Sequence, residues 1–398
     1  MVYKNKLVQK NISKEEIVSF IKELYPNNDF IPLHAPRFSN KEKEYVLDTI
    51  ESTYVSSVGK YVDQFEEIMC NYTGAKYAIA VVNGTAALHI SLILAGVKQG
   101  DLVLTQALSF IATCNAISYI GAEPCFIDVD PVSMGLCPSS LETFLQSSTF
   151  IKNEVCYEKE SGKKISACVP MHTFGFPIEI DKLVAICSKF FIPVVEDAAE
   201  SIGSTYKNKC TGTFGLLGTY SFNGNKTITC GGGGIVVTND ENLGKMAKHL
   251  TTQAKVPHKW NFFHDHIGYN YRCPNINAAL ACAQLEKLEE IISNKRVTAN
   301  LYNDFFMNSN IHFNSEPNHT RSNYWLNSVL FESIENRDLF LEYSNTNGVM
   351  TRPIWALMHR MKMFENCLHD GLKNSIDIES KLVNLPSSFR ELNSIVNE

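Results

Sequence analysis

The chain has 398 residues, of which 44% are hydrophobic and 20% are charged, so it can bury a large core and is expected to divide into two domains. Its formal net charge is −6 without any basic stripe, which argues against a nucleic acid or an anionic membrane surface as a partner. The 12 cysteines are scattered, and no pair has the two-residue spacing of a metal knuckle, so they indicate reduced thiols of a cytoplasmic protein.

The amino terminus gives no sign of export. Residues Met1–Lys6 lead into a charged amphipathic segment, whereas a signal peptide needs an apolar core. No apolar run elsewhere reaches the length that spans a membrane. We therefore expect a cytoplasmic protein without a membrane partner.

Seven short apolar runs alternate with helical or loop segments, which predicts an α/β fold with a mostly parallel sheet. Residues 141–164 have the composition of an exposed insertion before the fourth run. After Pro274, apolar residues recur at helical spacing from 278 to 295 and indicate a bridge to a smaller carboxyl-terminal domain. The expected runs are 78–82, 102–105, 125–127, 165–170, 192–196, 218–222 and 235–238, and the expected divisions are an amino-terminal segment 1–40, a large domain 41–275 and a small domain 276–398.

An acid follows the fifth run. The β-branched residues 192–195 predict a buried strand, which places Asp197 just past its carboxyl end, where ligands of open α/β sheets bind. A carboxylate there can keep a pyridine nitrogen protonated, because a neighbouring negative charge raises the pKa of the ring. The alternative interpretation is that Asp197 caps a helix beginning at Ala198.

A lysine lies between the sixth and seventh runs. Lys226 is therefore in a loop, where lysines are usually solvated. The nearby Gly224 and Gly231–Gly234 let the backbone approach a ligand more closely than a surface hairpin requires. A desolvated lysine in this place can form a Schiff base, and Ser221 can offer its hydroxyl to a phosphate.

A second phosphate contact is expected after the first run. Residues 81–88 pass from strand to turn to helix, and backbone N–H groups at a helix amino terminus bind anions. The alternative for Asn83-Gly84-Thr85 is an ordinary turn and helix cap. An acid, a lysine and two phosphate contacts are together the parts that pyridoxal phosphate chemistry requires.

Five segments carry a resemblance to a known family. They are 83–88, 109–113, 196–200, 221–226 and 268–272, in the family's order. Over nearly its whole length the chain resembles sugar aminotransferases of the DegT/StrS type, which are fold-type I pyridoxal phosphate enzymes. The resemblance implies a large domain with a seven-stranded, mostly parallel sheet, a smaller carboxyl-terminal α+β domain, and a homodimer with shared active sites.

The resemblance also implies roles for single residues. Lys226 forms the Schiff base with pyridoxal phosphate and later moves the proton between the amino donor and the cofactor, while Asp197 pairs with the pyridine nitrogen. Phe110 stacks on the cofactor ring, although an aromatic residue in an apolar run is also typical of a core. Glu200 stands where many relatives carry Gln or His near the ring. The implied phosphate contacts are the backbone of Gly84, Thr85 and Ala86, the hydroxyl of Ser221, and Asn270 from the second subunit.

Other segments favour a substrate class. Five further segments are similar to the subgroup that aminates nucleotide-linked 4-keto-6-deoxy-N-acetylhexosamines in bacillosamine and legionaminic acid pathways. These segments are residues 31–36, 54–62, 269–275, 352–355 and 384–388. This similarity implies amino transfer from glutamate to the 4-keto carbon of a UDP-linked sugar. Alternatives are a GDP-perosamine-type or 3-keto sugar aminotransferase and a non-catalytic, pyridoxal phosphate-binding regulatory homologue.

Four residues are candidates for contacts with the nucleotide sugar: Ser56, Ser57, Lys60 and Arg352. The two basic residues are chosen because Lys and Arg bind diphosphate oxygens, and the alternative for all four is a solvated surface side chain. A nicotinamide-dependent sugar enzyme is disfavoured, because the glycine run precedes a strand and no G-x-G-x-x-G opens a helix.

A group of histidines remains. His258, His264 and His266 lie near Trp260 and Asp265, but their spacing is mixed and the stretch is loop-like. We expect solvated or locally hydrogen-bonded histidines, and therefore no metal site.

Overall fold

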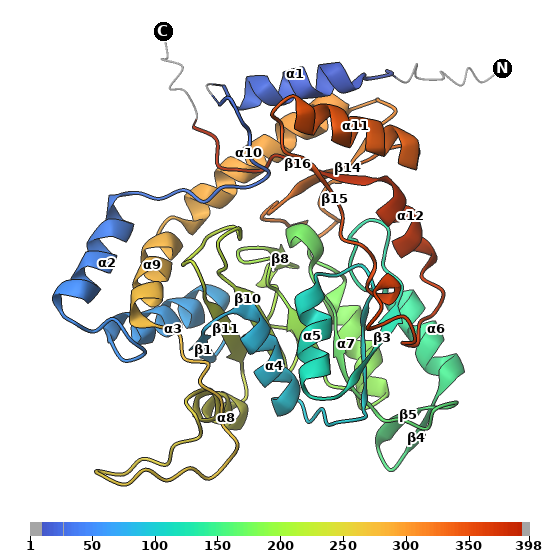
Figure 1. Cartoon of the computed structure of the whole chain (residues 1–398). Helices are drawn as coiled ribbons and strands as arrows, with labels where there is room; N and C mark the ends of the chain where they lie inside the picture. The colour runs from blue at the N-terminus through green and yellow to red at the C-terminus, as the bar shows by residue number, and fades with distance from the viewer. Residues whose placement is uncertain (1–9, 27, 392–398) are drawn as a thin grey trace.

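The computed structural model describes residues 10–26 and 28–391, which fold into a mixed α/β structure (Figure 1). The Met1–Lys6 stretch, in which we expect no signal peptide, lies outside the described residues. None of the helices in the described ranges combines the length and the apolar composition that crossing a membrane demands.

All seven apolar runs form strands, which hydrogen-bond as one ladder of four and one of three. Strand β11 is antiparallel to both of its neighbours, and the other pairs in these ladders are parallel. Two isolated parallel bridges, Cys168 to Val194 and Met171 to Asp197, connect the ladders. The first ladder has the order β1 (Tyr77–Val81), β11 (Gly234–Thr238), β10 (Leu217–Ser221), β7 (Val195–Asp197), and the second β3 (Glu123–Ile127), β2 (Leu102–Gln106), β6 (Ile165–Val169).

Successive residues of a strand point to opposite faces, and each face buries its own core. Ala78 and Ala80 of β1 pack toward α3 and α9, whereas Ile79 and Val81 pack toward α4 and α8. The helices around the two ladders are α2 (Asn40–Glu51), α3 (Lys60–Thr73), α4 (Gly84–Leu94), α5 (Ile111–Tyr119), α6 (Pro138–Ser148), α7 (Ile180–Lys189), α8 (Glu241–Thr251) and α9 (Asn275–Leu285).

The carboxyl-terminal part contains a separate antiparallel sheet with the strand order β12, β14, β16, β15. Helix α1 lies beside α10 and α11 at the top of Figure 1, and its Ile17 and Ile21 share a core with Tyr302 and Val383. The described part of the amino-terminal segment thus packs on the carboxyl-terminal elements. These elements are α1 (Lys14–Leu24), α10 (Leu288–Phe306), β12 (His312–Phe313), β14 (Asn327–Leu330), α11 (Ile334–Thr346), β15 (Arg352–Pro353), α12 (Lys373–Lys381) and β16 (Leu382–Leu385).

The expectation of an exposed insertion at 141–164 is wrong for its first part. Helix α6 buries Leu141, Phe144 and Leu145 against the ladder of three, while its serines and Glu142 give the helix a polar composition. The second part is an antiparallel hairpin of β4 (Thr149–Lys152) and β5 (Val155–Glu158). A further small sheet is formed by β8 (Thr205–Tyr206), β9 (Lys209–Cys210) and β13 (Thr320–Arg321).

Candidate active site

A cavity of about 310 Å³ opens where the carboxyl ends of β7 and β10 meet the amino terminus of α4. Most of the residues that the sequence points to come together here, although they are far apart along the chain. The expected residues that line the cavity are Gly84, Thr85, Phe110, Asp197, Glu200, Ser221 and Lys226.

Asp197 is the last residue of β7 and is buried. The hydroxyl of Thr113 donates to its Oδ2 at 2.6 Å, and the backbone N–H of Ala199 donates to its Oδ1 at 3.1 Å. The next element of the described chain is β8, with no helix between Asp197 and Thr205, so the alternative of a helix cap is wrong. Two donors fix the carboxylate on the cavity wall, and its remaining lone pairs can accept a bond from a cationic ligand.

Lys226 is not a solvated loop lysine, since only 11% of its side chain is exposed. Its Nζ lies 3.2 Å from Oε1 of Glu200 and 4.2 Å from the ring centre of Trp325, which adds a cation–π contact. Trp325 is held in turn by a 2.7 Å hydrogen bond from its Nε1 to the carbonyl oxygen of Asn225. The lysine amine is therefore positioned from two sides.

Glu200 is fully buried beside this amine. Burial raises the pKa of its carboxyl to about 7, while the ammonium of Lys226 and the backbone N–H of Phe174 act in the opposite direction. The Phe174 N–H donates to Oε2 at 2.9 Å and leaves Oε1 facing Lys226. A carboxyl group with such a pKa can exchange a proton with its neighbour near neutral pH.

The amino terminus of α4 forms the opposite wall. The side chain of Asn83 caps the helix by accepting the N–H of Ala86 at 2.8 Å, so Ala86 does not offer the free donor that we expect from the sequence. The N–H groups of Gly84 and Thr85 precede it in the first turn and are not used within the helix. A Cβ on Gly84 would lie 2.8 Å from Cβ of Ser221, which shows how closely the two proposed phosphate contacts approach each other.

The glycine run Gly231–Gly234 does not bring the backbone close to the cavity, contrary to what the sequence led us to expect. Gly231–Gly234 are not among the residues that line the cavity. A Cβ on Gly234 would lie 2.4 Å from the carbonyl oxygen of Asn83, so this glycine lets β11 pack against the turn before α4. Gly234 therefore packs against this turn from behind, and the run does not line the cavity.

Phe110 is 48% exposed and lines the cavity, which rules out the alternative of a core residue. Its ring makes an edge contact with Trp355, with ring centres 6.1 Å apart. It precedes the first residue of α5, so a short helix presents it at the mouth of the cavity.

Six expected residues do not line the cavity: Ala86, Asn270, Ser56, Ser57, Lys60 and Arg352. Asn270 is exposed and accepts two hydrogen bonds from the side chain of Arg272. Lys60 pairs with Asp48 at 2.8 Å, and Arg352 donates to the side chain of Asn345 at 2.8 Å.

Several lining residues were not singled out from the sequence. Thr113 and Trp355 lie within the similar segments but had no role assigned to them, and Trp325 lies outside every motif. Their function depends on partners distant in the sequence, such as Asp197 for Thr113, so no local pattern indicates them. Other lining residues without an assigned role are Leu88, Ala112, Met171, Ala199, Asn223 and Asn225.

The comparisons with known proteins decide the family. The sequence profile of the DegT/DnrJ/EryC1/StrS aminotransferase family matches residues 36–393. The chain belongs to this family. It is a sugar aminotransferase that depends on pyridoxal phosphate, as the resemblance implied.

Two relatives and one structure give the degree of similarity. The chain is 37% identical to GDP-perosamine synthase of Escherichia coli O157:H7 over 90% of this chain and 93% of that protein. It is 36% identical to EpsN, a putative pyridoxal phosphate-dependent aminotransferase of Bacillus subtilis (strain 168), over 85% and 84% of the two chains. A family aminotransferase from Brucella abortus superposes with a TM-score of 0.80 and 26% identity, covering 87% of this chain and 90% of that one.

Proposed function

We propose that this aminotransferase moves an amino group from glutamate to the 4-keto carbon of a GDP-linked 4-keto-6-deoxyhexose, giving a perosamine-type amino sugar. The observation that carries amino transfer is the convergence of Lys226, Asp197 and the amino terminus of α4 in one cavity. The 37% identity with a GDP-perosamine synthase supports the GDP-linked sugar over the UDP-linked N-acetylhexosamine expected from sequence segments.

The residues present fit the cofactor. Lys226 would hold it covalently, the carboxylate of Asp197 would pair with its ring nitrogen, and Phe110 would lie on the ring. Its phosphate would be bound by the free N–H groups of Gly84 and Thr85 and by the hydroxyl of Ser221. When bound, pyridoxal phosphate carries the amino group and withdraws electrons from the carbon that loses its proton.

Glu200 would control the proton on Lys226. Lys226 must lose its proton to act as a nucleophile, and Glu200 Oε1 lies 3.2 Å from Nζ, within reach to accept it. Trp325 on the other side of Nζ limits the positions that the amine can take. The freed amine can then remove a proton from the amino donor and return it to the product side.

The nucleotide would lie at the mouth of the cavity. Arg352 stands three residues before Trp355, which lines the cavity, and its guanidinium would leave Asn345 to bind the diphosphate. Ser56, Ser57 and Lys60 would contribute further contacts. Binding energy from the nucleotide would be used to orient the keto carbon against the cofactor.

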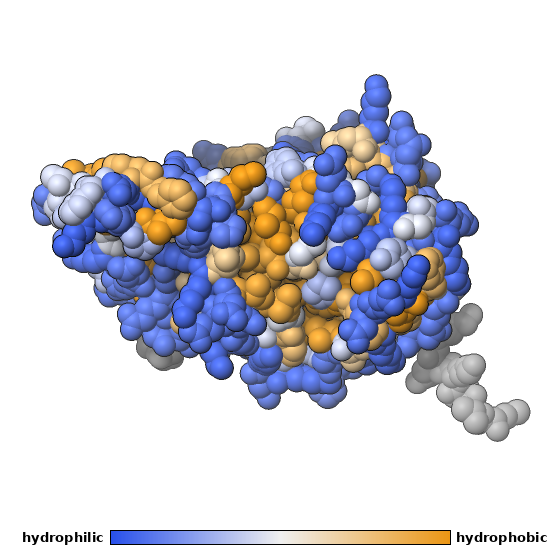
Figure 2. Space-filling model, turned by 90° about the horizontal axis from the view of Figure 1, so that it is seen from below, coloured by the Kyte–Doolittle hydropathy of each residue, from blue (hydrophilic) through white to orange (hydrophobic). Residues whose placement is uncertain are grey.

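We also propose a homodimer with shared active sites. Asn270 is exposed and outside its own chain's cavity, as a residue that reaches a second subunit must be. The loop after α8 extends from the body at the lower left of Figure 1 and exposes Trp260, Phe262, Phe263 and Ile267 by 64 to 85%. The face in Figure 2 also has a central area of apolar side chains, and exposed apolar surface of this kind is typical of interfaces.

The experiment for the substrate compares nucleotide sugars directly. The enzyme with bound cofactor is incubated with ¹⁵N-glutamate and either a GDP-linked 4-keto-6-deoxyhexose or a UDP-linked 4-keto-6-deoxy-N-acetylhexosamine. We expect ¹⁵N in the GDP sugar at a kcat/KM at least about tenfold higher than for the UDP sugar. A higher kcat/KM for the UDP-linked sugar would favour the UDP-linked substrate expected from the sequence segments. Absence of ¹⁵N from both sugars would favour a 3-keto substrate or a non-catalytic homologue.

A further inference from the structure

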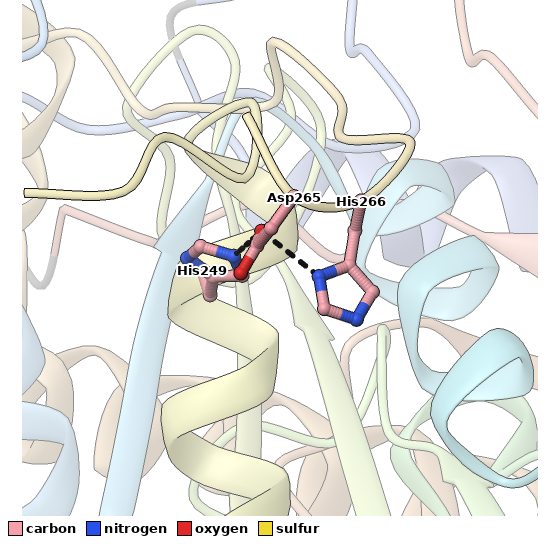
Figure 3. Close-up of side chains that lie close together, drawn as sticks. All are labelled: His249, Asp265 and His266. Carbon is pink, nitrogen blue, oxygen red and sulfur yellow. Dashed lines mark hydrogen bonds and ion pairs between the residues drawn. The ribbon is translucent and has the colours of Figure 1, made fainter. Parts of the chain in front are cut away.

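Three side chains outside the cavity converge on one point (Figure 3). His249 lies in the last turn of α8, and Asp265 and His266 lie in the loop that returns toward Asn270. Nε2 of His249 is 2.6 Å and Nδ1 of His266 is 2.9 Å from the same oxygen, Oδ1 of Asp265. The ligand atoms of all three residues lie within 4.8 Å of one another.

The loop is already folded so that these atoms meet. Lys255 and His264 form an isolated antiparallel bridge, and Nδ1 of His264 lies 2.7 Å from the carbonyl oxygen of Gln253. His258 instead accepts hydrogen bonds from backbone N–H groups at 260 and 261. Two of the three histidines that the sequence draws attention to therefore stay outside the cluster, and His249 takes part in their place.

The donor set is that of a borderline divalent metal. Two imidazole nitrogens and one carboxylate oxygen are common ligands of Zn²⁺, and three protein ligands leave a position for water. Both imidazoles already face the same carboxylate oxygen of Asp265. The site is reachable, because Asp265 and His266 are exposed.

We propose that His249, Asp265 and His266 form a binding site for a divalent transition metal of the Zn²⁺ class. The metal would lie between the three ligand atoms, in place of the direct contacts between the imidazoles and Asp265. This proposal departs from the sequence-based expectation of no metal site. None of the three residues lines the active-site cavity, so this inference does not depend on the proposed function.

The site has a structural consequence. It joins the end of α8 to the loop that exposes Trp260, Phe262 and Phe263 and that leads into Asn270. A bound metal would add a crosslink at the base of this loop and reduce its conformational freedom. The loop would then be more resistant to proteolysis at the exposed Lys255 and Lys259.

The test measures binding of Zn²⁺ to the untagged, full-length enzyme with its cofactor bound, after treatment with a chelator and gel filtration. Isothermal titration should give a site of one Zn²⁺ per chain. His249→Gln, Asp265→Asn and His266→Gln should each weaken that site at least about tenfold, because each removes a ligand. His258→Gln is the matched control, since it changes an exposed histidine of the same loop, and it should leave the affinity unchanged.

Two readouts separate this site from binding elsewhere, including at the 12 cysteines. Tryptic cleavage at Lys255 and Lys259 should slow on addition of Zn²⁺ in the wild type and in His258→Gln, and should not change in His266→Gln. Circular dichroism checks that each variant is folded. The proposal would be overturned if all three ligand variants bound Zn²⁺ with the affinity of the wild type, or if the wild type bound no Zn²⁺.

Discussion

Nζ of Lys226 and Oε1 of Glu200 lie 3.2 Å apart in a buried corner of the cavity, although the two residues come from different loops. The ammonium of Lys226 can pair with the ionised carboxylate of Glu200, and this carboxylate can accept a proton from the ammonium. This pair links the ionisation of Glu200 to the reactivity of Lys226, and it can be tested through its pH dependence.

The first prediction concerns Glu200→Gln in the protein without cofactor. Burial raises the pKa of Glu200 from 4.5 to about 7, so within this interval the folded protein holds a proton that the unfolded chain has released. The stabilisation that this proton provides is fully present below 4.5, the pKa of Glu200 in the unfolded chain. It is lost as the pH rises through about 7, the pKa of Glu200 in the folded protein. The wild type should therefore lose stability relative to Glu200→Gln as the pH rises through this interval, as measured by urea unfolding.

A matched control for this series is Glu160→Gln, which changes an exposed glutamate near the hairpin of β4 and β5. Its unfolding free energy should follow that of the wild type at every pH. Parallel curves for the wild type and Glu200→Gln would contradict the raised pKa of Glu200.

A second prediction concerns Thr113→Val, which removes the hydroxyl that donates to Asp197 and keeps the shape of the side chain. The carboxylate is buried, so loss of one donor should lower the free energy of unfolding by about 1.5–3 kcal/mol. Thr143→Val is the control, because Thr143 is an exposed helical residue whose hydroxyl donates to the backbone carbonyl of Ser139, and its effect should stay within about 0.5 kcal/mol. Equal effects of the two substitutions would show that Thr113 does not position Asp197.

A third prediction concerns the close approach of α4 to β10. Gly84→Ala would put a Cβ at 2.8 Å from Cβ of Ser221 and should displace the first turn of α4, at a cost of about 1–3 kcal/mol in stability. Pyridoxal phosphate should bind at least about tenfold more weakly, as followed by fluorescence titration of the apoenzyme.

Gly224→Ala provides the matched comparison, because nothing lies within 4 Å of the added Cβ and its backbone does not need positive φ. It should leave stability and cofactor affinity near their wild-type values. Tight cofactor binding by Gly84→Ala would mean that the amino terminus of α4 does not hold the phosphate.

The fourth prediction concerns the amine itself. Lys226→Arg keeps a positive charge beside Glu200 but removes the primary amine, so kcat for amino transfer should fall at least about 10²-fold while the fold is retained. The matched control is Lys259→Arg in the exposed loop, with activity expected at the wild-type level. Turnover by Lys226→Arg within tenfold of the wild type would remove Lys226 from the mechanism.

Local pattern was enough to predict Asp197 and Lys226. Asp197 ends a strand, and Lys226 follows a strand, that is apolar because both its faces are buried, and this places both residues at the sheet edge where ligands bind. Thr113 and Trp325 could not be predicted, because their roles come from contacts with Asp197 and Asn225, which only the tertiary fold creates. The same limit applies to His249, which joins the loop histidines only because α8 ends beside them.

Helix α6 shows a different kind of error. Its buried Leu141, Phe144 and Leu145 have helical spacing, so the signal was present in the sequence. Serines and Glu142 around this stripe, and the charged residues after it, give the segment the composition of a loop, which masks the helical periodicity. The glycine run was misinterpreted in a related way, since Gly234 packs against Asn83 and not against a ligand.

The most direct test of the central claim is the visible absorption spectrum of the purified protein with pyridoxal phosphate. We expect a yellow band from the cofactor bound to Lys226, which glutamate bleaches and a GDP-linked 4-keto-6-deoxyhexose restores. Bleaching without restoration would keep the aminotransferase and contradict the proposed sugar. Absence of the band after added cofactor would contradict the assignment of Lys226 and Asp197 as the centre of the site.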